Sequence, residues 1–231
     1  MRATKKFMRS KKFYQALGLP KGTPSLIDFY RFKRVRSQIF GKSVIDIGCG
    51  RADFLKLIKS DYEITGTEVN MKRVEYCNKV LGEGVVVLSN LEENIGIKDN
   101  SYDTVICMEV LEHLIDPHEA LTKLIKISRK RVIITIPFEE EIRWFLCVHC
   151  AKYTPSYGHL HSFNLENMKG IIPPNVQIIR IELIGNRVLN YLLGFRSIFK
   201  LPIQISSIID KIFNTIFRRA RWVMIILDKK S

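Results

Sequence analysis

The sequence of 231 residues lacks any apolar run long enough to cross a membrane. The longest uninterrupted apolar stretch near the C-terminus runs only from Trp222 to Leu227, whereas a transmembrane helix needs ~20 such residues. The basic N-terminus is not followed by an apolar core, which argues against a secretory signal. Hydrophobic residues make up 46% and charged residues 26%, which excludes a disordered chain and predicts one globular domain with a substantial core.

Cysteines are few and irregularly spaced, at Cys49, Cys77, Cys107, Cys147 and Cys150. An odd number without regular spacing argues against a disulfide framework. We therefore expect reduced thiols and a cytoplasmic location.

Acidic residues are scarce at both ends of the chain. Residues 1–43 carry a net charge of +11 and residues 187–231 a net charge of +7, whereas residues 44–186 carry −4. Basic ends attract polyanions, so RNA and an anionic membrane surface are both candidate partners, the second as a peripheral contact. The alternative is a basic surface that is simply solvated.

Between residues 44 and 137, short apolar segments alternate with helical patterns. Strands are expected at 44–47, 62–68, 84–88, 102–107 and 131–137. This rhythm predicts βαβ units and a parallel sheet. Two later segments, 176–184 and 221–227, are strand-like, and the segment between them is too long for a hairpin loop, so we expect a helical insertion. Ahead of the sheet, Thr23 as cap and Pro24 in the first turn predict a helix that runs to about residue 40.

Two common phosphate-binding motifs are incomplete on either side of the first strand. A dinucleotide fingerprint needs a third glycine where Asp53 stands, and a Walker motif ending at Ser43 needs glycine where Arg36 stands. A phosphate on the turn of Gly48 and Gly50 would meet a carboxylate. A ligand with a cationic head fits better, because Asp46 and Asp53 suit a sulfonium and an amino group.

Polar side chains also follow the next two strands. Glu68 ends the second strand, where a carboxylate can accept both hydroxyls of an adenosine ribose. Asn90 follows the third strand, where its carbonyl oxygen can accept from an adenine amino group. Each residue alone is a weak signal, but their order on one edge of the sheet predicts a nucleoside site.

Four parts of the sequence, in their order along the chain, resemble the class I S-adenosylmethionine-dependent methyltransferases. They are the segment 44–53, Glu68, Asn90 with Leu91, and the run from Tyr102 to His113. The resemblance covers about residues 40–137. It implies an α/β fold with a doubly wound, mostly parallel sheet of seven strands in the order 3-2-1-4-5-7-6, with strand 7 antiparallel. We expect a methyltransferase domain at 41–231 after a basic helical extension at 1–40, with a Cys/His-rich lid at 138–165 and a helical insertion at 187–219.

The resemblance implies that S-adenosyl-L-methionine is the cofactor. Its expected binding residues come from the first turn and the ends of the next strands: Asp46, Gly48, Cys49, Gly50, Asp53, Glu68, Val69, Asn90, Leu91 and Met108. Two departures from the family pattern are Ala52, where a third glycine is frequent, and Asn90, where an aspartate is frequent.

The segment after the fourth strand indicates which kind of methyl acceptor to expect. No Asn-Pro-Pro-Tyr or Asp-Pro-Pro-Tyr sequence is present, which disfavours methylation of nucleobase amino groups. The run Glu109-Val-Leu-Glu112-His113 instead offers groups that remove the proton of an oxygen acceptor, directly or through a metal. We predict catalytic roles for Glu109, Glu112, His113 and His161, the alternative being a helix cap and a surface pair.

The Glu-x-x-Glu-His run resembles two groups of methyltransferases. One is the ubiquinone-biosynthesis type of O-methyltransferase, and the other is the small-RNA 2′-O-methyltransferases, in which the run binds a divalent metal with a later histidine. Candidate metal ligands are therefore carboxylates, imidazoles and the thiols of a Cys-x-x-Cys knuckle: Glu109, Glu112, His113, His159, His161, Cys147 and Cys150.

The leading expectation is an enzyme that methylates an oxygen of a small-molecule or lipid-linked acceptor by direct displacement. The alternatives are a metal-assisted RNA methyltransferase that uses the basic ends, and a non-catalytic module that only binds the cofactor. The apolar residues of the insertion, from Leu189 to Phe217, predict a contact with the rest of the domain, with a second copy in an oligomer, or with a membrane interface.

Overall fold

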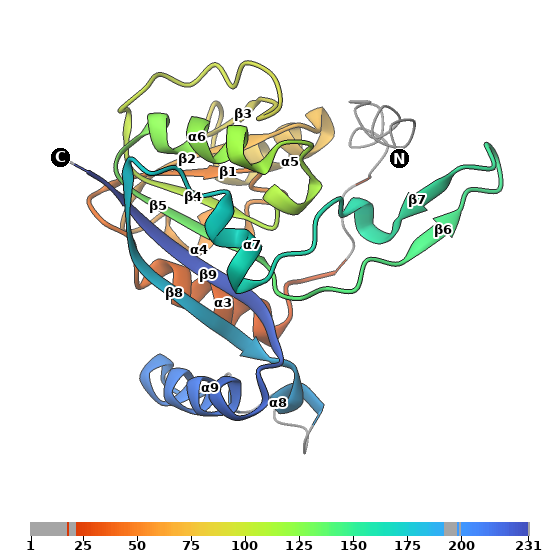
Figure 1. Cartoon of the computed structure of the whole chain (residues 1–231). Helices are drawn as coiled ribbons and strands as arrows, with labels where there is room; N and C mark the ends of the chain where they lie inside the picture. Colours follow the sequence, from red (N-terminus) through yellow and green to blue (C-terminus); the bar gives the residue numbers. More distant parts are fainter. Residues whose placement is uncertain (1–17, 19–21, 192–197, 199, 231) are drawn as a thin grey trace.

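The computed structural model describes residues 18, 22–191, 198 and 200–230, so the basic arm expected at the N-terminus lies largely outside the described residues. Its main feature is a seven-stranded sheet in the order β3-β2-β1-β4-β5-β9-β8 (Figure 1). The strands are β1 (Ser43–Ile47), β2 (Glu63–Glu68), β3 (Val86–Leu88), β4 (Tyr102–Met108), β5 (Ser128–Pro137), β8 (Val176–Asn186) and β9 (Ala220–Lys229).

Strands β1 to β5 are parallel, whereas β9 is antiparallel to both β5 and β8. The expected order, with the last strand antiparallel, is therefore confirmed. Because the parallel strands point the same way, their carboxyl ends meet at one edge, and the polar residues that follow them are brought together there.

Helices cover both faces of this sheet. They are α3 (Leu26–Arg36), α4 (Asp53–Ile58), α5 (Met71–Leu81), α6 (Pro117–Ile127), α7 (Leu165–Gly170), α8 (Arg187–Tyr191) and α9 (Ile203–Phe217). Successive strand residues face opposite sides. Val44 thus joins a buried cluster with residues of α3, α4 and α5, whereas Ile45 joins a second cluster with residues of α6 and α7.

Helix α3 begins and ends at other residues than the sequence pattern indicates. Its N-cap is Ser25, whose side chain accepts from the N–H of Asp28 while the Asp28 carboxylate accepts from the N–H of Ser25. This reciprocal capping box fixes the start, so the expectation of Thr23 as cap was wrong. The helix ends at Arg36, and Phe40 instead pairs its backbone with the Thr104 hydroxyl at the start of the sheet.

Two features depart from the plain sheet-and-helix pattern. The expected helical insertion between the last two strands is confirmed as α8 and α9. After β5, strands β6 (Trp144–Leu146) and β7 (Tyr153–Pro155) form a separate hairpin that projects from the body of the molecule (Figure 1). In the part of the chain that the structure describes, no helix has the length and apolar character needed to cross a membrane.

Candidate active site

The turn after β1 is built on left-handed backbone. Gly48 and Gly50 have φ of 76° and 59°, and the N–H groups of Gly48 and Cys49 both donate to the Thr67 carbonyl at 2.9 Å. A Cβ on Gly48 would lie 2.5 Å from a methyl carbon of Val110, so only glycine fits there. A Cβ on Gly50 would meet nothing within 4 Å, which leaves open space beside its backbone.

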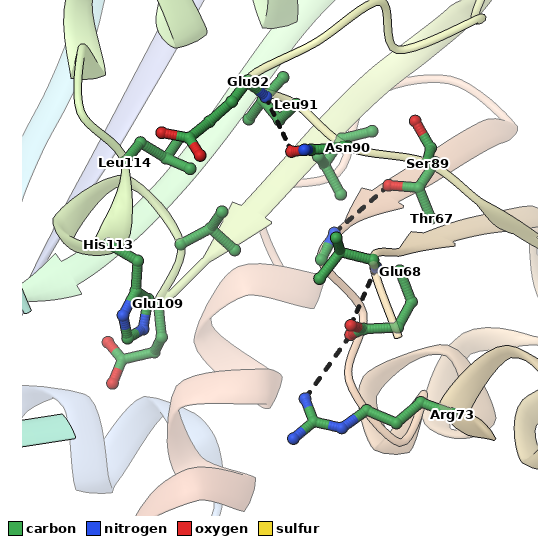
Figure 2. A pocket seen from close by; sticks show the side chains of 14 residues that line it. Thr67, Glu68, Arg73, Ser89, Asn90, Leu91, Glu92, Glu109, His113 and Leu114 are labelled. Carbon is green, nitrogen blue, oxygen red and sulfur yellow. Dashed lines mark hydrogen bonds and ion pairs between the residues drawn. The ribbon is translucent and has the colours of Figure 1, made fainter. Parts of the chain in front are cut away.

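Glu68, the last residue of β2, is buried and holds this turn in place. Its carboxylate accepts from the N–H of Gly50 at 3.0 Å, of Val69 at 2.9 Å and of Asn70 at 3.1 Å. The Arg73 guanidinium forms an ion pair with it at 3.8 Å (Figure 2). A carboxylate can accept about four hydrogen bonds, so Glu68 keeps some acceptor capacity for a ligand.

A first cavity of about 160 Å³ lies over this edge of the sheet (Figure 2). Seven residues that the sequence predicted for the site line this cavity. Five are cofactor-binding candidates, Gly48, Glu68, Val69, Asn90 and Leu91, and two are catalytic candidates, Glu109 and His113. Other lining residues were not predicted from the sequence, among them Arg73 on α5 and Glu92. Glu92 accepts from the N–H of Ile115, and its own N–H donates to the Asn90 side chain at 3.1 Å.

Five predicted cofactor residues do not line this cavity, namely Asp46, Cys49, Gly50, Asp53 and Met108. Asp46 lies on the same face of the sheet as Val44, and its pKa is raised to about 7. Burial is the main cause, the Arg31 guanidinium opposes it, and the Glu68 carboxylate adds to it. A hydrogen bond with the Cys77 thiol, together with burial, raises the pKa of Cys49. Asp53 opens α4 and pairs with Lys56 at 3.1 Å, and Met108 packs against the cluster of α3 and α4.

A second cavity of about 600 Å³ adjoins the first and shares Glu109 and His113 with it. Its other walls include two cations, Arg187 and Arg221, and two aromatic side chains, Tyr157 and Trp222. Helix α3 closes one side through Ile27. The shared residues therefore stand where a ligand in one cavity would meet a ligand in the other.

Glu109 follows β4 in a left-handed conformation, with φ of 57°. Its N–H donates to the Thr135 carbonyl at 2.9 Å, and its carboxylate pairs with the buried Arg31 guanidinium at 3.1 Å. Burial raises the pKa of Glu109, and Arg31 opposes this effect. The conformation is costly for a non-glycine residue, and it directs the start of the Glu-x-x-Glu-His run toward the two cavities.

Three side chains with metal-binding atoms lie next to this boundary. Their ligand atoms, on Glu112, His113 and His159, fall within 4.8 Å of one another. Glu112 is fully buried, and neither carboxylate oxygen accepts a hydrogen bond from another residue in the described part of the chain. Burial and the neighbouring Glu109 carboxylate raise the pKa of Glu112 well above its usual value.

The two imidazoles of this cluster differ in their surroundings. Burial, with a smaller effect of His159, lowers the pKa of His113 to about 4, although its Nδ1 lies 3.3 Å from the Gly158 carbonyl oxygen. Nδ1 of His159 contacts the Glu140 carboxylate. Both histidines line the second cavity.

The remaining predicted ligands lie apart from this cluster. Nε2 of His161 lies 2.8 Å from the Leu114 carbonyl oxygen, and His161 lines neither cavity. Cys147 and Cys150 lie near the end of the projecting hairpin, where hydrogen bonds from the N–H groups of His149 and Cys150 lower the pKa of Cys147. Among the described residues, neither cysteine belongs to a group of three metal-binding side chains.

Comparison with known proteins agrees with this architecture. A family model described as a methyltransferase domain matches residues 45–136. A ubiquinone biosynthesis O-methyltransferase from Pectobacterium carotovorum is 28% identical over 123 residues, which cover 50% of this chain and 51% of that protein. One from Vibrio campbellii is 32% identical over 84 residues, or 34% of this chain and 36% of that protein. The chain thus spans about half the length, or less, of these curated relatives.

Solved structures share the fold over almost the whole chain. A SAM-dependent methyltransferase from Archaeoglobus fulgidus has a TM-score of 0.59 at 20% identity and covers 99% of this chain and 98% of its own. The [4+2]-cyclase SpnF has a TM-score of 0.60 at 14% identity and covers 91% of this chain and 84% of its own. A cyclase and a methyltransferase therefore share this fold, so the chemistry has to be argued from the site.

Proposed function

We propose that this chain, which belongs to the class I S-adenosylmethionine-dependent methyltransferase superfamily, transfers a methyl group to an oxygen of a small-molecule acceptor. The observation that carries the proposal is the pair of adjoining cavities that share Glu109 and His113. One cavity holds the groups that suit an adenosine, and the other has space for an acceptor beside them. Methyl transfer needs this arrangement, because donor and acceptor must approach in line.

The residues of the first cavity fit S-adenosylmethionine. Glu68 offers the remaining acceptor capacity of its buried carboxylate to the ribose, and Gly50, which does not line the cavity itself, leaves open space beside the turn. The bound cofactor supplies an electrophilic methyl group on a sulfonium centre. The volume of the first cavity, about 160 Å³, lies below the ~300 Å³ of a typical small-ligand site, so this cavity alone accommodates only part of the cofactor.

The second cavity supports a small acceptor. Its volume of about 600 Å³ lies within the ~300–1,000 Å³ range of sites for small ligands. Tyr157 offers an exposed aromatic surface. Arg187 and Arg221, the second of which stacks on the buried Trp222 ring, offer charge to a carboxylate or phosphate on the acceptor. We therefore infer an acceptor that combines a hydroxyl group with an apolar ring or chain and an anionic group.

His159 is the better-supported proton acceptor for this reaction. It lines the second cavity, and the contact of its Nδ1 with the Glu140 carboxylate orients the imidazole ring, as a general base requires. Neutral His113, beside it at a ring-centroid distance of 4.7 Å, helps to orient the ring without adding a competing charge. We therefore assign the role first predicted for His161 to His159.

Labelled S-adenosylmethionine tests this proposal with hydroxylated acceptors that differ in ring, chain and anionic group. We expect His159→Gln to lower turnover at least ~100-fold with unchanged cofactor affinity, because general-base catalysis contributes 10²–10⁴-fold. The matched control is His118→Gln, which changes an exposed histidine on α6. Cofactor binding without transfer to any hydroxylated acceptor, in the panel or in a cell lysate, would contradict the proposal and support a binding module.

A metal-assisted reaction, with a small molecule or an RNA hydroxyl as acceptor, is the second candidate. The observation that favours it is Glu112, whose buried oxygens lack partners in the described chain and lie within reach of His113 and His159. Carboxylate and imidazole donors fit a divalent cation such as Mn²⁺, which would supply a Lewis acid for deprotonation of the acceptor.

Direct titration with Mn²⁺ separates this candidate from base catalysis. If the cluster binds metal, we expect stoichiometric Mn²⁺ binding that Glu112→Gln abolishes, and loss of transfer in the presence of a chelator. Transfer that is indifferent to the chelator, with no Mn²⁺ bound, rejects the metal-assisted form. Label in RNA in place of small molecules would reject the small-molecule acceptor.

A further inference from the structure

Helix α9 is oriented with its polar side inward. Three polar residues spaced four apart, Ser206, Asp210 and Asn214, are buried against the domain. Four isoleucines face outward with 48–65% of their surface exposed: Ile205, Ile208, Ile212 and Ile216. A helix at a protein surface ordinarily shows the opposite arrangement, with its apolar stripe toward the core.

Specific hydrogen bonds hold this orientation. The Asp210 carboxylate accepts from the Tyr30 hydroxyl of α3 at 3.0 Å, and from the N–H groups of Gly185 at 2.8 Å and Asn186 at 2.7 Å. The Asn214 side chain donates to the Leu183 carbonyl at 3.0 Å and accepts from the Asn186 side chain at 2.8 Å. Rotation of the helix to bury its isoleucines would break all of these bonds, so the outward apolar face is built into the fold.

The charges around this face have one sign. Lys200 precedes the helix, Lys211 lies within it, and Arg218 and Arg219 follow it, and all four are exposed. Asp210 is the single acidic residue between 187 and 227 in the sequence, and it is buried. The face therefore combines a row of isoleucines with cations at both ends and on one flank.

We propose that the outward face of α9 docks this protein on an anionic lipid bilayer. A helix of 15 residues is about 22 Å long, which is less than the ~30 Å of a bilayer core, so it lies in the plane of the membrane. Isoleucines enter the boundary of the acyl chains, and the lysines and arginines contact the headgroups.

Charge complementarity favours a lipid surface over a second copy of the chain. A symmetric pair of α9 helices would bring the same face of both copies together, and with it the same cations. No exposed acid of the helix or its flanks is present to neutralise them. Anionic headgroups supply the opposite charge, and the acyl chains cover the isoleucines.

Vesicle sedimentation with the full chain tests this proposal independently of methyl transfer. The protein is mixed with vesicles of phosphatidylcholine alone, or with vesicles in which part of it is replaced by phosphatidylglycerol. We expect binding to the anionic vesicles that weakens with salt. Ile208→Gln combined with Ile212→Gln should lower this binding about tenfold or more, and Lys211→Glu about fivefold.

The matched control is Ile178→Gln combined with Ile179→Gln, which changes two isoleucines of the edge strand β8, each 43% exposed. Thermal unfolding checks that the variants fold. Equal binding by the α9 and β8 variants, or no preference for anionic vesicles, would overturn the proposal. So would a dimer in light scattering that the α9 variant converts to a monomer, because the isoleucines would then belong to an interface between copies.

Discussion

Asp46 gives the sharpest test of the electrostatics at the first turn. Burial raises its pKa from the usual 3.8 to about 7, more than the nearby Arg31 guanidinium lowers it. The folded protein therefore keeps a proton on Asp46 over a pH range in which the unfolded chain has lost it. A raised carboxyl pKa contributes stability at low pH, and this contribution is lost as the pH rises toward 7.

Asp46→Asn removes this titration with little change in shape. At pH 5 folded Asp46 is neutral but the unfolded carboxyl is ionised, so the wild type has already lost part of this contribution, whereas the asparagine of the variant does not titrate. At pH 8 the wild type carries a buried charge, so the variant should gain about 2.5 kcal/mol over the wild type between the two pH values. The effect of His113, whose lowered pKa stabilises the fold as the pH rises from 4 to 6.5, cancels in this difference.

Urea unfolding of both proteins at pH 5, 6, 7 and 8, followed by circular dichroism, measures the difference directly. The two curves of unfolding free energy against pH should separate steadily and level off above pH 7. Parallel curves would refute the argument, because they would mean that Asp46 ionises in the folded protein as it does in the unfolded chain.

Three further predictions concern the turn, the cofactor and the anchor of α9. Glu68→Ala should raise the dissociation constant for S-adenosylmethionine at least ~10-fold, since hydrogen bonds to a charged group contribute ~1.5–3 kcal/mol each. Titration calorimetry measures this constant, and the control is Glu63→Ala, which changes an exposed residue of the same strand. Equal dissociation constants for the two variants would contradict the prediction. Tyr30→Phe should lower the free energy of unfolding by about 0.5–1.5 kcal/mol and Asp210→Ala by about 3 kcal/mol or more. Only the second change leaves two buried N–H groups, those that donate to the Asp210 carboxylate, without an acceptor. Equal losses in denaturant unfolding would show that those bonds do not hold α9. Ala52, with φ of 56°, should tolerate Ala52→Gly within about 1 kcal/mol, whereas Ala52→Val should lower the melting temperature clearly, since a β-branched residue is strained in that region.

The fold could be predicted because its signals are local and repeat. Strands that alternate with helices, a glycine turn after the first strand and an acid after the second all describe one topology, and the sheet has that order. The cap of α3 was missed because Thr23 and Ser25 are both good caps, and the choice depends on Asp28 completing a reciprocal pair with Ser25.

The site could be predicted where residues follow strand ends, and not where they depend on side-chain direction. Gly48, Glu68 and Asn90 meet at one cavity because parallel strands end together. Asp46 stands only two residues before Gly48, yet it belongs to the opposite sheet face from Ile45 and Ile47 and lines no part of that cavity. The sequence shows its charge but not the Arg31 guanidinium that faces it from α3.

Helix α9 shows the limit of periodicity more clearly. Its isoleucines recur at helical spacing, a pattern typical of a core-facing stripe. The inward side is decided instead by Tyr30, Gly185 and Asn186, which come from other elements and offer hydrogen bonds that only Asp210 and Asn214 can complete. Leaving those buried N–H groups unpaired would cost about 1–3 kcal/mol each, which offsets the gain from burying half-exposed isoleucines.

Three of the seven non-glycine residues with positive φ in the described part of the chain lie at the two cavities or at the turn beside them. Ala52 beside the glycine turn, Glu109 between the two cavities and Tyr157 on the wall of the second all have positive φ, near 56°. Each such conformation costs about 1–2 kcal/mol for a non-glycine residue, and none is needed to form the sheet. A fold keeps strain of this kind where surrounding bonds impose it, as the Thr135 carbonyl and the Arg31 guanidinium do at Glu109. The geometry at the boundary between the cavities is therefore held in advance of any ligand, which is the condition that an in-line transfer requires.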